Sequence, residues 1–198
     1  ELGDYILTED HLWECFTGIY DGNGYELTGV RITHSPDYSS MSLFPCVDEG
    51  GVLKNITVRD GLIIGGDGVS NVGVLSSWFE EGDILNCKVI DCNIIADDPT
   101  GPFLYGGLVG SFNTGNIANC LFVGDITLSD SGSGYGVYQV GGITGDFTGD
   151  GGIVNCLVVG DITCTGDIVN LVGGITGVTS EIRDFGEIIN CGFIGNIT

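Results

Sequence analysis

The stretch GDILNC at residues 82–87 recurs as GNIANC at 115–120, GGIVNC at 151–156 and GEIINC at 186–191. A divergent copy, GVLKNI, stands at 51–56. From copy to copy the asparagine recurs after 31, 33, 36 and 35 residues. Spacing of this kind is typical of a repeat protein in which each structural unit stacks on the next.

Two further short blocks accompany each copy. GDIT at 124–127 and 160–163 and GNIT at 195–198 follow the Asn-Cys pair. GGLVG at 106–110 and GGITG at 141–145 and 173–177 precede the next copy, with VGVL at 72–75 as a weaker version. Three β-like blocks separated by Gly and Asn describe one coil of a three-sided parallel β-solenoid. We therefore predict an all-β, right-handed parallel β-helix of about five to six coils, each 31–36 residues long.

The repeat boundaries divide the chain into one irregular coil and several regular ones. Residues 1–50 are predicted to form an irregular first coil, and residues 51–198 hold the repeats. The predicted coils span 51–81, 82–114, 115–150 and 151–185, with a partial coil at 186–198. Because the last repeat is incomplete, we expect a single continuous solenoid that belongs to a longer protein.

Composition and charge exclude several classes of function. The 198 residues include 36 Gly but only 2 Ala, 2 Lys, 1 Gln and 1 Met, so strong helix formers are scarce. Five Lys and Arg face 27 Asp and Glu, which gives a formal net charge of −22. Such a surface repels phosphate backbones and anionic lipids, which excludes nucleic acid as a partner. No run approaches the ~18 apolar residues of a membrane helix, so we expect no membrane insertion.

Taken together, the blocks resemble the GLUG motif of bacterial and archaeal surface proteins and of some protist ones. FTGIYDGNGYELTG at residues 16–29 resembles the F-x-G-x-x-D-G-N-G segment that commonly precedes such repeats. The resemblance covers nearly the whole chain and departs from the pattern at 91–94, where DCNI replaces GDIT with a one-residue slip. It implies a large exported adhesin-like or structural protein, and it supplies no catalytic residues.

Of the eight cysteines, four recur at one repeat position and four do not: Cys15, Cys46, Cys92 and Cys164. None forms a C-x-x-C pair or stands at zinc spacing with a histidine, which argues against a metal centre. Cys15 and Cys46 both lie in the irregular first coil and form the candidate disulfide. Four cysteines recur at one repeat position, and there we expect reduced thiols packed as small hydrophobes: Cys87, Cys120, Cys156 and Cys191.

Candidate binding groups are few. Asp125 and Asp161 of the GDIT blocks would stack in adjacent coils, either as solvated corner residues or with a Ca²⁺ ion between them. Two sequons, at Asn55 and Asn196, are candidate glycosylation sites. A carbohydrate-binding or carbohydrate-cleaving β-helix, similar to a tailspike, would need aromatic platforms for sugar rings. The side chains that could supply them are Trp13, Trp78, Tyr105, Tyr135 and Tyr138.

The strand after each Asn corner is apolar at every position, which predicts an exposed apolar stripe. Successive side chains on a strand point to opposite faces, so if Cys120 and Phe122 point inward their neighbours point outward. Over four coils the outward set forms a stripe of candidate interface residues: Ile90, Leu121, Val123, Leu157, Val159 and Ile194. Either long loops of the same chain fold back over this stripe or another subunit packs there.

These observations favour a non-catalytic, extracellular or cell-surface β-solenoid. We expect a stalk or fibril-forming building block that binds copies of itself or neighbouring subunits, and glycans are a further candidate partner. No catalytic residue and no cofactor is expected, with Ca²⁺ as the one candidate ion. The alternative is the carbohydrate-binding or carbohydrate-cleaving β-helix.

Overall fold

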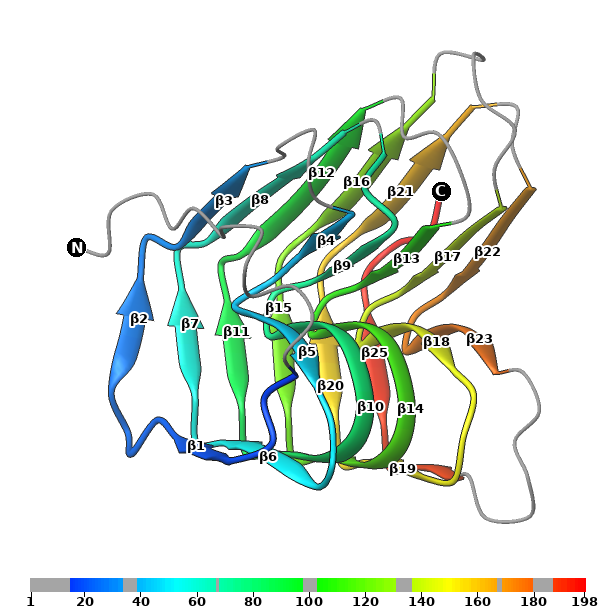
Figure 1. Ribbon diagram of the computed structural model, residues 1–198. Helices are drawn as coiled ribbons and strands as arrows, with labels where there is room; N and C mark the ends of the chain where they lie inside the picture. Colours follow the sequence, from blue (N-terminus) through cyan, green and yellow to red (C-terminus); the bar gives the residue numbers. More distant parts are fainter. Residues whose placement is uncertain are drawn as a thin grey trace.

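The computed structural model describes residues 15–33, 39–66, 68–97, 103–130, 137–166, 169–179 and 187–198. Every strand pair in it is parallel, and each strand pairs with the strand one repeat further along the chain. The strands stack side by side along one axis from the N-terminal to the C-terminal end (Figure 1). The predicted all-β parallel solenoid is therefore confirmed, and the described residues contain no helix.

The strands form four sheets, which we call sheets A to D. Sheet A contains β1 (Ile19–Asp21), β5 (Phe44–Val47), β6 (Gly51–Lys54), β10 (Ser76–Leu85), β14 (Val109–Ala118), β18 (Thr144–Phe147), β19 (Gly151–Val154), β23 (Thr176–Thr179) and β24 (Glu187–Ile189). Sheet B contains β2 (Glu26–Thr28), β7 (Thr57–Arg59), β11 (Lys88–Ile90), β15 (Leu121–Val123), β20 (Leu157–Val159) and β25 (Gly192–Ile194).

The other two sheets have one strand per coil. Sheet C contains β3 (Arg31–Thr33), β8 (Leu62–Gly65), β12 (Asn93–Asp97), β16 (Ile126–Ser129) and β21 (Ile162–Thr165). Sheet D contains β4 (Ser40–Met41), β9 (Asn71–Gly73), β13 (Phe103–Gly106), β17 (Val137–Gly141) and β22 (Val169–Gly173). Within the described ranges, sheets C and D thus contain five strands each and sheet B contains six.

The cross-section differs from the three sides predicted, because the Gly-Gly blocks are corners rather than sides. β13 ends at Gly106 and β14 begins at Val109, so GGLVG at 106–110 turns from sheet D into sheet A. A Cβ on Gly106 would stand 1.8 Å from the Val109 carbonyl oxygen. A Cβ on Gly110 of sheet A would stand 2.9 Å from the Val72 backbone nitrogen of sheet D. The two sheets approach so closely that only glycine fits at these positions.

β10 and β14 are long and curved, and each contributes to sheet A twice (Figure 1). The first half of β10 pairs with β5, and its second half pairs with β6. One long strand thus spans the two segments that β5 and β6 form separately in the neighbouring coil, and each coil has more segments than the repeated sequence blocks suggest.

The core consists of stacked identical or similar side chains. Ile117 pairs in register with Ile153, and Ile153 pairs with Ile188. Ile117 and Ile153 are fully buried, whereas Ile188 lies at the last coil and is exposed. An isoleucine column therefore lies in the core wherever a further coil covers it. A column of rings, Phe79, Phe112 and Phe147, stacks beside it with centroids 5.4 to 5.6 Å apart.

The corner between sheets A and B is built by the repeated asparagines. All of them have left-handed backbone angles, with φ between 52° and 57°: Asn55, Asn86, Asn119, Asn155 and Asn190. Asparagine tolerates this conformation better than other non-glycine residues. The side-chain amide of Asn155 donates to Asn119 Oδ1 at 3.1 Å, and that of Asn190 donates to Asn155 Oδ1 at 3.3 Å. The corner therefore bonds from coil to coil.

The apparent slip at residues 91–94 reflects two kinds of corner between sheets B and C. Ile90 pairs with Val123, and Ile94 pairs with Ile126. The corner between these paired positions therefore has three residues in one coil, 91–93, and two in the next, 124–125. The coils before it also use three residues, with left-handed Gly29 and Asp60 in the place of Asp91. Later coils use a glycine, Gly124 or Gly160, with φ of 155° and 145°.

Among the described residues, no helix is long and apolar enough to cross a membrane.

Candidate functional site

The outer face of sheet B carries the apolar stripe that the alternation predicts. Phe122 and Val158 are buried in the core. The outward residues, which we call the sheet B stripe, are Ile90, Leu121, Val123, Leu157, Val159 and Ile194. All are at least partly exposed, and Leu157 and Ile194 are 37% and 62% exposed. Register places them side by side, with Leu121 opposite Leu157 and Val123 opposite Val159. No described segment covers the face.

The stripe is continuous with the few cations of this chain. Lys88 pairs in register with Leu121, and Arg59 pairs with Ile90. Arg59 lies 3.4 Å from Glu26 and 3.8 Å from Asp91, while Lys88 makes no ion pair with any described residue. Glu26 is the single acidic residue on the sheet B strands. Sheet B thus presents an apolar and weakly basic face on a protein of net charge −22.

Asp125 and Asp161 form a ladder of hydrogen bonds at the corner before sheet C. Asp125 Oδ1 accepts the Asp161 backbone N–H at 2.8 Å, and Asp161 Oδ1 accepts the Asn196 N–H at the same distance. One coil earlier, Asn93 Oδ1 accepts the Asp125 N–H at 2.9 Å. The carboxylates therefore replace strand hydrogen bonds where the chain turns. Within the described residues, no group of three or more His, Cys, Asp or Glu side chains is arranged to hold a metal ion.

The two sequon asparagines occupy different environments. Asn55 is part of the Asn corner, and its side-chain nitrogen donates to Asp21 Oδ1 at 2.9 Å. This bond is the main reason that the pKa of Asp21 is lowered. Asn196 is exposed, and its side-chain nitrogen donates to Asp161 Oδ1 at 3.0 Å. Because a sugar is attached through that nitrogen, the exposed Asn196 is the more accessible of the two candidates.

The repeated cysteines stack as free thiols. The single S–H of Cys120 has two carbonyl acceptors within reach, Ala118 at 3.3 Å and Ile84 at 3.6 Å. Hydrogen bonds with Cys156 and Cys87, together with burial, raise the pKa of Cys120 well above its usual value. The same bonds to Cys120 lower the pKa of Cys87 and of Cys156. The thiols of Cys87, Cys120 and Cys156 are buried, so this column fills space in the core and places its S–H groups against backbone carbonyl oxygens.

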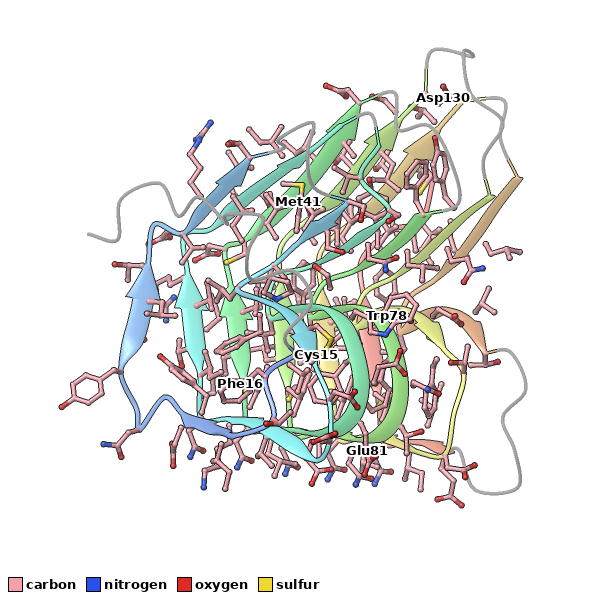
Figure 2. The ribbon with its side chains drawn as sticks, viewed as in Figure 1. Cys15, Phe16, Met41, Trp78, Glu81 and Asp130 are labelled. Atoms are coloured by element: carbon pink, nitrogen blue, oxygen red, sulfur yellow. A yellow bond between two sulfur atoms is a disulfide. The ribbon has the colours of Figure 1, made fainter. Side chains whose placement is uncertain are left out.

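A cavity of about 410 Å³ opens beside the first two coils. It is lined by Cys15, Ser39, Ser40, Pro45, Cys46, Ser70, Asn71 and Trp78. Cys15 and Cys46, the pair singled out from the sequence, are joined by a disulfide. Figure 2 shows Trp78 and Cys15 near one another at the outside of β5 and β10.

Of the five aromatic residues named from the sequence as candidate platforms, Trp78 is the exposed one within the described part of the chain. It is 41% exposed, whereas Tyr105 and Tyr138 are buried and cannot stack on a ligand. Trp13 and Tyr135 lie outside the described residues. Sequence reasoning missed Ser40, Ser70 and Asn71, because they belong to no repeated block and come together only when sheet D packs beside sheet A.

Comparison with known proteins gives one partial match. A region of 98 residues, half of this chain, is 31% identical to Halomucin from Haloquadratum walsbyi (strain DSM 16790 / HBSQ001). The chain spans about 1% of the length of that protein. No protein-family profile matches the chain. No solved structure matches it. The β-solenoid and the similarity to Halomucin fit a structural or surface role.

Proposed function

We propose that this chain is a non-catalytic β-solenoid segment of a cell-surface or secreted assembly, of the kind that carries GLUG repeats. Three observations support this. The coils repeat the same left-handed Asn corner from Asn55 to Asn190, and like residues stack in register in the core. The candidate carboxylates Asp125 and Asp161 accept backbone hydrogen bonds rather than converging on a cleft. The partial similarity to Halomucin agrees with a surface role.

The observation that carries the proposal is the sheet B stripe. Apolar side chains that stay exposed over four coils of a highly acidic protein favour contact with another apolar surface. Cations at one end of the same face, Arg59 and Lys88, reduce the repulsion that −22 charges would otherwise impose on a neighbouring subunit. Sheet B is accordingly the face through which a building block would contact copies of itself or adjoining subunits.

The test replaces the centre of the stripe by residues that keep the strand. Leu121, Val123, Leu157 and Val159 are changed to Thr, which is β-branched and therefore compatible with a strand. We expect the native chain to form oligomers or fibres, as seen by sedimentation velocity and electron microscopy. The quadruple variant should sediment as a monomer with an unchanged β circular dichroism spectrum.

The matched control changes outward apolar residues of another sheet. Ile64 and Ile95 pair on the outer side of sheet C, and Ile64→Thr with Ile95→Thr should leave assembly unchanged. A native chain that stays monomeric at every concentration would refute the proposal. So would a quadruple variant that assembles as the native chain does.

A further inference from the structure

The cavity beside the first two coils lies between two columns of outward side chains. Ser40 and Asn71 pair in register on sheet D and form one wall. Cys46 and Trp78 pair in register on sheet A and form the other. Its volume of about 410 Å³ falls within the range of small-ligand sites. The cavity lies between sheets D and A, and none of its lining residues belongs to the sheet B stripe.

The indole of Trp78 is held in place by its polar edge. Its Nε1–H donates to the carboxylate of Glu80, and the other oxygen of Glu80 accepts from the Asn113 side-chain amide at 2.9 Å. Asn113 in turn accepts from the Thr148 hydroxyl at 3.5 Å. These bonds run over three successive coils and orient the ring, so its exposed surface is apolar and pre-positioned. A ring fixed in this way loses little conformational entropy when a ligand stacks on it.

The opposite wall supplies hydrogen-bonding groups that both donate and accept. The Ser70 hydroxyl donates to the Ser39 carbonyl oxygen at 3.1 Å, which leaves its oxygen able to accept. Asn71 is only 7% exposed, yet its side-chain amide makes no hydrogen bond with any described residue. The amide group of Asn71 is not fully enclosed and lines the cavity, so its oxygen and nitrogen are free to bond a ligand there.

The lining selects a neutral ligand. It contains no charged side chain, and the net charge of −22 around it repels anions. A cation would stack on Trp78, but the lining contains no carboxylate to pair with its charge. A ligand with one apolar face and a rim of hydroxyl groups satisfies both walls at once. We propose that this cavity binds a neutral sugar ring, stacked on Trp78 and hydrogen-bonded by Asn71, Ser40 and Ser70.

The site accommodates one ring rather than a long chain of them. In the next coil the column of Asn71 continues with Leu104, and the column of Trp78 continues with Ser111. The next coil therefore has no aromatic side chain in the place of Trp78 and no amide in the place of Asn71. The site is therefore built for a terminal or single pyranose unit of a glycan. This binding is independent of assembly through sheet B.

The test measures binding of neutral oligosaccharides by tryptophan fluorescence and calorimetry. Trp13, the other tryptophan of the sequence, is replaced by Phe so that the fluorescence reports on Trp78 alone. Gluco-, manno- and galacto-configured oligosaccharides are titrated, with uronic acid oligomers and tetramethylammonium as charged comparisons. We expect saturable binding of at least one neutral series, and weakening by about tenfold or more in Trp78→Ala, because stacking on an indole is lost.

Two controls separate binding from folding. Trp78→Phe keeps an aromatic platform and should retain part of the affinity, and Ser129→Ala on sheet C should retain all of it. Circular dichroism checks that each variant keeps its β content. Absence of binding to every neutral series, equal binding by Trp78→Ala, or preference for tetramethylammonium would each overturn the proposal.

Discussion

Asparagine at the corner between sheets A and B performs two tasks that no other common residue combines. Its backbone adopts a left-handed conformation, with φ of 55° at Asn155, which costs most residues about 1–2 kcal/mol. Its side chain bonds to the neighbouring coils, as Asn155 donates to Asn119 and accepts from Asn190. The backbone N–H of Asn155 also donates to the Ile189 carbonyl oxygen of the next coil at 2.9 Å, so the amide column adds side-chain bonds to the backbone bonds of this corner.

Substitution at this corner should separate the two tasks. Asn155→Gly keeps the left-handed conformation and loses only the side-chain bonds, so we expect a loss of about 1 kcal/mol in the free energy of unfolding. Asn155→Ala loses the bonds and adds backbone strain, so about 2 kcal/mol or more should be lost. Denaturant unfolding of both variants measures the difference. Equal stability of the Gly and Ala variants would show that the backbone angle carries no cost.

At the scale of elements, the contact between sheets D and A is set by glycines. β9, β13 and β17 approach the first halves of the sheet A strands so closely that main-chain atoms touch. A Cβ on Gly110 would lie 2.6 Å from the Ser77 oxygen, 2.9 Å from the Val72 nitrogen and 3.0 Å from the Leu104 oxygen. All three are backbone atoms, which cannot rotate away as a flexible side chain could.

Gly110→Ala should therefore force the two sheets apart. We expect a loss of about 2 kcal/mol or more in unfolding free energy, as in other overpacked cores. Gly152→Ala is the matched control on β19: a Cβ there meets the Val154 side chain at 3.3 Å and no backbone atom closer than 3.5 Å. Its stability should change by no more than about 0.5 kcal/mol. Comparable losses in the two variants would mean that the sheet contact is not the cause.

Sequence periodicity predicts those features that repeat, and it misses those made by contact between sheets. Ile153 in the core, Asn155 at the corner and Leu157 on the outer face each follow from the repeat and from strand alternation. The fourth sheet does not, because the close approach that requires Gly110 joins strands whose contact no local pattern reveals. The sequence misses the cavity for a related reason. Asn71 and Trp78 belong to no repeated block, and they come together only because sheet D packs beside sheet A.

At the scale of the whole molecule, charge opposes the compactness that the core provides. The described acidic residues are spread along every coil, and the described cations lie on strands of the first three: Arg31, Lys54, Arg59 and Lys88. Lys54 lies 3.4 Å from Asp21, and Arg59 lies 3.4 Å from Glu26, so two of these four cations already pair with carboxylates. The later coils hold mutually repelling carboxylates, stacked one above another at positions such as Asp125 and Asp161.

Salt should therefore stabilise the fold. Raising NaCl from 0.1 to 1 M shortens the screening length from about 10 to 3 Å, which weakens repulsion between coils. We expect the melting temperature to rise by about 5 °C, measured by circular dichroism. In the double variant Asp125→Asn, Asp161→Asn, the amide oxygens keep the hydrogen-bond ladder, as Asn93 does, but the two charges are gone. The rise in melting temperature with NaCl should therefore be smaller in this variant. If Asp125 and Asp161 bind Ca²⁺, CaCl₂ at equal ionic strength will stabilise the native chain further but not this variant. A melting temperature that falls with NaCl would contradict the electrostatic account, because attraction between charges would then dominate.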